Sequence, residues 1–91
     1  MFKTSQTIND QPVFIQFVSS GFGEHDFQII SRALDRPARV RFNNDRKLIR
    51  THGGVTESVA QSAYDDYKSD EDAKFEQWLK DKNIPTPPAI D

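Results

Sequence analysis

The two histidines are the residues best suited to proton transfer near neutral pH. His25 lies between Glu24 and Asp26, and a nearby carboxylate raises the pKa of an imidazole or selects its tautomer. His52 precedes two glycines. Adjacent residues of a helix point in different directions, so we interpret His25 as a surface residue at a helix start and not as half of a catalytic pair. We interpret His52 as a loop residue, with contact to a phosphate or a partner as the alternative. We therefore expect no catalytic residue and no enzyme activity.

Metal and phosphate sites also lack their usual patterns. The acidic residues at 65–66 and 70–72 show neither the alternation nor the glycine of a calcium-binding loop. The chain has no cysteine, which excludes disulfides and thiolate metal ligands. Residues 21–23 read Gly-Phe-Gly and predict a turn, because the third glycine and the lysine of a phosphate-binding loop are missing. We expect no bound metal and no cofactor.

Charge is distributed very unevenly along the 91 residues. The net charge is -2 over residues 1–31, +5 over residues 32–55 and -5 over residues 56–91. All but one of the basic residues in the middle segment are arginines, whose planar guanidinium suits bidentate contacts with carboxylate or phosphate. This pattern indicates binding of an acidic partner by the middle segment or of a basic partner by the acidic segment. A third interpretation is that the segments neutralise each other within the fold or across a homodimer.

The first part of the chain predicts a hairpin followed by a helix. Residues 3–8 have β-forming character, residues 9–12 form a turn cluster, and residues 13–18 are β-branched and aromatic, as in a buried strand. After a break at 19–23, Phe27, Ile30 and Leu34 have the spacing of an amphipathic helix. We therefore expect a short helix over 24–34 that ends before a proline.

The second part predicts another hairpin and a helical region. Residues 38–42 alternate between small or apolar side chains and arginine, and residues 47–51 suit a return strand. From residue 55 to about residue 83 apolar side chains repeat at helical spacing. Ser69 and the acids after it resemble a capping box, which leaves open whether this region is one bent helix or two helices. The proline-rich residues 84–91 predict an extended tail.

These elements together predict a small α+β domain over residues 1–83 with a tail at 84–91. Two β-hairpins form one antiparallel sheet, with an intervening helix and one or two C-terminal helices packed on one face. Apolar residues make up only 35% of the chain, which excludes a large core, and no segment is apolar enough to span a membrane. Since no signal peptide is visible either, we expect a cytoplasmic location.

The most economical functional hypothesis is a non-enzymatic binding protein. Small size, segregated charge and the lack of catalytic residues are typical of stoichiometric inhibitors, regulators and adaptors that bind a protein partner. Small phage or plasmid proteins that block nucleic-acid or defence machinery share this profile, although the analogy rests on no motif. The predicted partner-binding residues are Arg36, Arg39, Arg41, Arg46, Lys47 and Arg50. The alternative is that the same basic hairpin contacts the phosphates of a nucleic acid.

Overall fold

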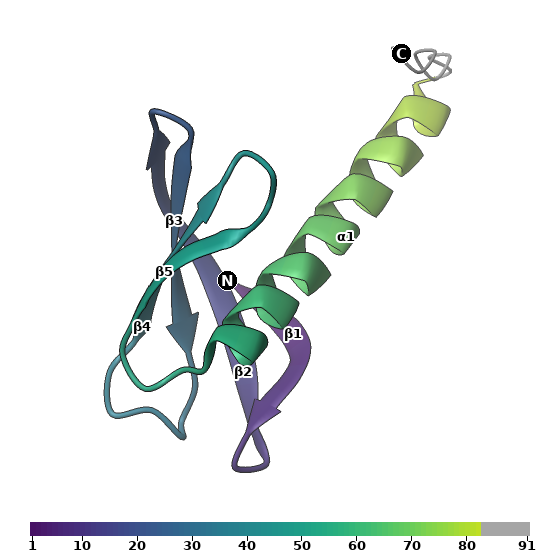
Figure 1. Ribbon diagram of the computed structural model, residues 1–91. Helices are drawn as coiled ribbons and strands as arrows, with labels where there is room; N and C mark the ends of the chain where they lie inside the picture. The colour runs from purple at the N-terminus through teal and green to yellow at the C-terminus, as the bar shows by residue number, and fades with distance from the viewer. Residues whose placement is uncertain (83–91) are drawn as a thin grey trace.

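A five-stranded antiparallel sheet and one long helix make up the structure, a computed structural model that describes residues 1–82 (Figure 1). The elements are β1 (Phe2–Ile8), β2 (Gln11–Gly21), β3 (Glu24–Ile30), β4 (Ala38–Asn43), β5 (Leu48–His52) and α1 (Glu57–Asp81). The strand order in the sheet is β1-β2-β3-β4-β5, so every strand lies beside its neighbours in sequence. The α+β class is confirmed. The tail expected at 84–91 lies outside the described residues.

Two tight turns connect the first three strands. Asn9 and Asp10 have φ angles of 49° and 64°, and Phe22 and Gly23 have φ angles of 54° and 77°. Positive φ at both central residues is the mark of the type I′ turn, whose twist matches that of the strands it joins. The sequence that interrupts the pattern around Gly21 is therefore a hairpin turn that leads directly into β3.

The helix expected over 24–34 is wrong, because its first part is the central strand β3. Phe27 and Ile29 are buried on the helix side of the sheet, while Gln28 between them points to the other side. Pairing with β2 and with β4 provides the hydrogen bonds of the β3 backbone on both edges. The helical spacing arose from combining Phe27 and Ile30, which lie on opposite faces of β3, with Leu34 in the loop after the strand. The sheet is thus a continuous meander rather than two hairpins separated by a helix.

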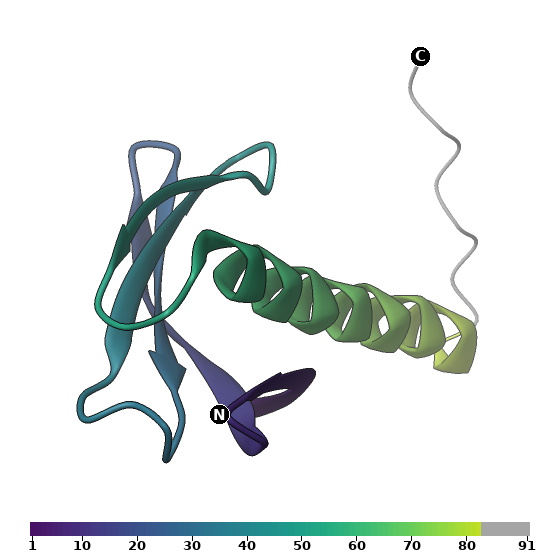
Figure 2. The same ribbon diagram turned by 60° about the horizontal axis from the view of Figure 1, so that its bottom comes forward.

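The C-terminal helical region is one helix, so the prediction of a cap at Ser69 is wrong. The N-cap is Thr56, whose Oγ1 accepts a hydrogen bond of 3.2 Å from the backbone N–H of Val59. Ser69 lies in the middle of α1. The first half of the helix crosses one face of the sheet, and the second half extends beyond the sheet (Figures 1 and 2). All residues from 71 to 78 are exposed.

Side chains from the sheet and the first half of α1 form the core. Its buried members are Val13, Ile15, Phe27, Ile29, Ala38, Val40, Phe42, Val55, Ala60, Ala63 and Tyr64. The rings of Phe42 and Tyr64 stack with their centroids 3.8 Å apart and their planes 12° apart. The sheet face opposite α1 contributes none of these residues, and no helix or strand among residues 1–82 covers it; we call it the uncovered face. No helix in residues 1–82 has the length and apolar character needed to cross a membrane.

Polar contacts attach α1 to both edges of the sheet. Near β1, the backbone N–H and the hydroxyl of Ser5 donate hydrogen bonds of 2.9 and 2.6 Å to one carboxylate oxygen of Asp66. These bonds lower the pKa of the Asp66 carboxyl. Near β5, the amide of Gln61 accepts from the backbone N–H of Leu48 and donates to the backbone carbonyl of Arg46, both at 2.9 Å. The helix is therefore held at two edges as well as through the core.

Candidate partner-binding site

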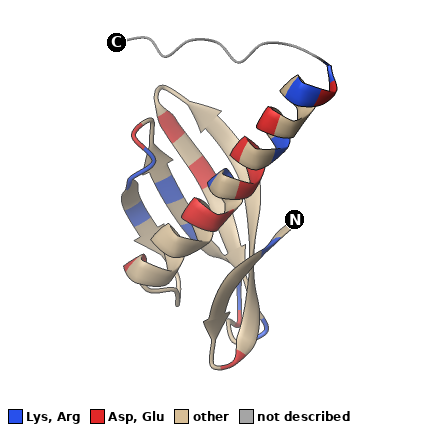
Figure 3. Cartoon of the chain, turned by 90° about the vertical axis from the view of Figure 1, so that its right-hand side faces the viewer, with Lys and Arg blue, Asp and Glu red and all other residues tan. Residues whose placement is uncertain are grey.

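The uncovered face of the sheet carries arginines from its last two strands. Strand alternation places Ala38, Val40 and Phe42 against the core and directs Arg39 and Arg41 to the opposite face. The register sets Arg41 opposite Arg50 of β5. Figure 3 shows the basic bands of these strands beside the acidic bands of the neighbouring strand β3. The basic face that the sequence predicts is therefore present on the side away from α1.

Two acidic side chains of β3 neutralise Arg41 within the sheet. Its Nε donates a 2.7 Å hydrogen bond to Asp26 Oδ1, and its Nη1 lies 2.8 Å from Glu24 Oε2. The hydrogen bond from Arg41 is the main cause that lowers the pKa of the Asp26 carboxyl below its usual 3.8. The same pairing raises the pKa of Arg41. Arg41 therefore has a structural role between β3 and β4 in addition to any role towards a partner.

Arg39 and Arg50 differ from Arg41, since both are exposed and neither forms an ion pair within residues 1–82. Together with His52 they line a shallow depression of about 230 Å³ on this face. His52 lies opposite Arg39 in the register. Guanidinium groups that face solvent beside one another are suited to bind carboxylate or phosphate oxygens. We call Arg39, Arg41, Arg50 and His52 the basic face.

The other three predicted residues lie at the ends of the same strands. Arg36 is exposed in the loop between β3 and β4 and lines a second depression, of about 450 Å³, that also includes His52. Arg46, in the turn between β4 and β5, reaches across to α1, where its two Nη atoms donate to Asp72 at 3.0 and 3.3 Å. Lys47 is exposed in the same turn. Arg36 therefore lies beside the basic face, whereas Arg46 contacts the helix through its ion pair with Asp72.

An apolar area on the uncovered side of the sheet was missed by sequence reasoning. Phe14 of β2 lies opposite Ile30 of β3, and with Met1 and Pro12 they line a depression of about 280 Å³. The apolar run 13–18 predicts a buried strand, but a continuous run does not show which of its side chains stay uncovered. We call Met1, Pro12, Phe14 and Ile30 the apolar patch. The one sequence feature that indicates the apolar patch is that residues 13–15 are all apolar, so apolar side chains must point to both faces of the strand.

The two histidines have different surroundings. His25 lies on the helix side of the sheet, where its Nε2 is 2.7 Å from Oδ1 of Asn44. His52 belongs to the basic face. Within the described part of the chain, no three or more histidines, aspartates and glutamates come together as a metal site. Neither histidine forms a hydrogen bond or an ion pair with a nucleophile or a carboxylate among residues 1–82.

Comparison of the chain with family models, with curated proteins and with solved structures finds no match. The class that the fold and the site define is a small α+β protein with one covered and one uncovered sheet face.

Proposed function

We propose that this protein is a non-enzymatic binding protein, an inhibitor, regulator or adaptor, that binds the acidic surface of a protein partner on the uncovered face of its sheet. The basic face supplies the charge contacts, and the apolar patch supplies desolvated area beside them. Partner interfaces commonly combine an apolar centre with a charged rim and use arginine as an anchor.

The observation that carries this proposal is the pair Arg41 and Arg50, directly opposite each other on neighbouring strands. Like charges in this arrangement destabilise a sheet. Asp26 and Glu24 form ion pairs with Arg41, and Asp26 attracts Arg39 and Arg50 more weakly, so these two exposed arginines have no ion pair of their own within residues 1–82. An acidic partner would compensate these two arginines, and the compensation would appear as binding energy and faster association.

Two features favour a protein over a nucleic acid as the partner. Asp26 and Glu24 lie among the arginines, so a regular row of phosphates would meet repulsion there, whereas a protein surface can set carboxylates opposite Arg39 and Arg50 and other groups opposite these two acids. Nucleic-acid surfaces are in addition polar and wet, whereas the apolar patch shares the same sheet face and needs an apolar counterpart. The nucleic-acid alternative is retained as an outcome of the test below.

The test is capture of partners by the purified protein from a lysate treated with nuclease, compared with the Arg39→Glu/Arg50→Glu variant. We expect a protein band that survives nuclease, weakens at high salt and is lost with the variant, because two attractive contacts become repulsive. The identified partner is then purified, and its affinity for both proteins is measured by calorimetry. A loss of at least tenfold in affinity is expected, equivalent to about 1.4 kcal/mol.

The matched control is Lys80→Glu/Lys82→Glu, which makes the same change in net charge at the far end of α1. We expect this variant to retain the partner. Equal losses with both double variants would show that only net charge matters and would contradict the proposed face. Recovery of nucleic acid alone, abolished by nuclease, would replace the proposal with the phosphate-binding alternative.

A further inference from the structure

The side of α1 that packs on the sheet continues beyond the sheet as an exposed aromatic stripe. Positions 64, 67, 71, 75 and 78 succeed one another at intervals of three or four residues and therefore share one side of the helix. Tyr64 and Tyr67 contact Phe27 of the sheet through edge-to-face ring packing. Phe75 and Trp78 occupy the same side in the free half of the helix, residues 69–81, where they are 58% and 49% exposed.

These two rings form an ordered apolar surface. Their centroids are 6.0 Å apart and their planes differ by 19°. In the free half only Leu79 is buried, and it is not part of the core cluster. Large exposed aromatic side chains that gather on one side of an element mark an interaction surface.

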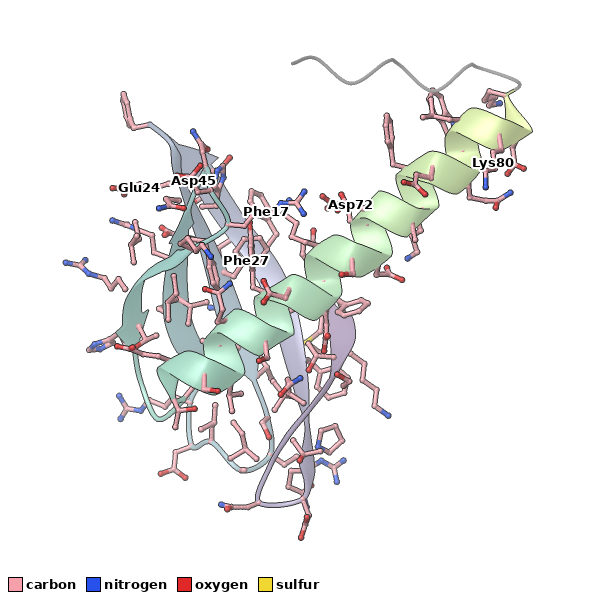
Figure 4. All side chains as sticks on the ribbon, turned by 45° about the vertical axis from the view of Figure 1, so that its right-hand side comes forward. Phe17, Glu24, Phe27, Asp45, Asp72 and Lys80 are labelled. Atoms are coloured by element: carbon pink, nitrogen blue, oxygen red, sulfur yellow. The ribbon has the colours of Figure 1, made fainter. Side chains whose placement is uncertain are left out.

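A groove begins where the sheet and the helix separate. It has a volume of about 480 Å³ and includes Phe17, Phe27, Tyr64 and Tyr67 in its lining. Figure 4 shows Phe17 and Phe27 on the sheet and Asp72 on the helix across from them. Phe17 is 50% exposed. The groove and the aromatic stripe therefore form one surface, with the groove near the sheet and Phe75 and Trp78 on the free half.

The order of charges in the free half distinguishes between partners. The half begins with three consecutive acids at 70–72 and no basic residue, whereas residues 74–82 contain three lysines, at 74, 80 and 82, and two acids, at 76 and 81. A second copy running in the opposite direction brings the basic end of one helix beside the acidic start of the other, whereas a parallel copy brings like charges together. Pairs of opposite charge across helices select orientation and partner. This charge order favours an antiparallel second copy over a parallel one.

We propose that the free half of α1 pairs antiparallel with α1 of a second copy, over that copy's residues 64–76, which include the turn that carries Tyr67. A pairing centred between residues 72 and 73 sets Trp78 of one copy beside Tyr67 of the other, at the edge of its groove. The same register sets Lys74 beside Glu71 and Lys80 beside Asp65 of the second copy. Each of these contacts occurs twice, related by a two-fold axis, as in a closed symmetric dimer. Only one side of a short stretch of helix contributes to the pairing, so we expect a small interface that dissociates on dilution.

The first experiment measures mass against concentration by analytical ultracentrifugation. The intact protein should change from monomer to dimer as the concentration rises, and Phe75→Gln/Trp78→Gln should remain monomeric over the same range. Both positions are exposed, so the variant is expected to fold, which circular dichroism checks. The matched control is Phe22→Asn, which removes an exposed aromatic side chain from the hairpin tip and should dimerise like the wild type. A monomer at every concentration, or a dimer that persists in the double variant, would overturn the proposal.

A second measurement uses the single tryptophan, which lies in the proposed interface. Its emission should shift to longer wavelength on dilution as Trp78 becomes hydrated, and the shift should follow the dimer fraction. Orientation is tested in the cysteine-free chain with Asp65→Cys and Lys80→Cys copies. Mixed copies should form a disulfide across the interface, and neither variant alone should do so. Disulfides within each separate variant would exclude the antiparallel arrangement.

This inference is independent of the proposed function, because the two surfaces have no residue in common. Arg39→Glu/Arg50→Glu should lose the partner and still dimerise. Phe75→Gln/Trp78→Gln should remain monomeric and still capture the partner. Failure of one proposal is therefore distinguishable from failure of the other.

Discussion

Arg41 illustrates at the level of single residues why a basic segment is not the same as a binding surface. Its guanidinium bridges two carboxylates on β3, whereas Arg39 on the same strand is directed to solvent without an ion pair in residues 1–82. The sequence shows the alternation that points both side chains outward. It does not show that Asp26 becomes the cross-strand neighbour of Arg41, because that contact depends on β3 being a strand in one register.

The Asp26–Arg41 pair makes stability depend on pH. The pKa of Asp26 is below its usual 3.8, so the ionised carboxylate stabilises the fold above that pH. This contribution is lost as the pH falls through the lowered pKa. We expect Asp26→Asn to reduce the free energy of unfolding at pH 7 and the difference from wild type to close in acid. Urea unfolding of both proteins across a pH series measures this difference in the free energy of unfolding. A difference that stays constant with pH would show that the Asp26–Arg41 pair does not cause it.

At the level of elements, the continuity of α1 answers a question that the sequence left open, whether the C-terminal region is one helix or two. Ser69 and the acids that follow satisfy the pattern of a capping box, but the chain is already helical there and the backbone N–H groups have helical partners. Thr56 has the same capability and stands where the helix does begin, after the loop that follows β5. The local sequence therefore contains two possible N-cap residues, and Thr56 is the N-cap because the helix begins directly after it.

Substitution of the two hydroxyl residues distinguishes a single helix from two. Thr56→Ala should lower the free energy of unfolding by about 1 kcal/mol, since a backbone N–H loses its side-chain partner. Ser69→Ala should change it by less than about 0.5 kcal/mol, because alanine favours a helix interior. Thermal or chemical unfolding of both variants provides the comparison. A larger loss for Ser69→Ala than for Thr56→Ala would indicate a helix start at Ser69.

At the level of the whole molecule, the core joins the sheet to only half of α1. Tyr64 is the last fully buried residue of the sheet-packed half, and its ring stacks on Phe42 of β4 while meeting Phe27 of β3. Burial raises the pKa of the Tyr64 hydroxyl. Beyond this point the helix leaves the sheet, and the same helix side changes from core to exposed surface.

This boundary predicts opposite effects for two aromatic residues of one helix. Tyr64→Ala should destabilise the fold by about 3–5 kcal/mol, as removal of a large buried ring does. Phe75→Ala should alter the stability of the monomer by less than about 0.5 kcal/mol, because its ring is exposed. Chemical unfolding at low protein concentration measures both. Similar losses for the two variants would show that the free half belongs to the core.

Sequence alone identified the α+β class, the strands around 38–42 and 47–51, and the outward direction of Arg39 and Arg41. Each of these follows from local physics, because alternation and turn residues act over a few positions. Sequence alone did not identify the strand at 24–30. A short apolar segment fits both the helical and the strand period, and only pairing with β2 and β4 selects the extended form.

The division of charge and the helical period of the C-terminal region were thus set by the sequence, because they depend on residue type and spacing. Only the tertiary structure decided which arginine is neutralised, that Phe14 and Ile30 form an uncovered patch, and that Phe75 and Trp78 extend past the sheet. These features depend on which strands become neighbours and where the sheet ends. Both are consequences of contacts between residues far apart in the chain, which no local pattern encodes.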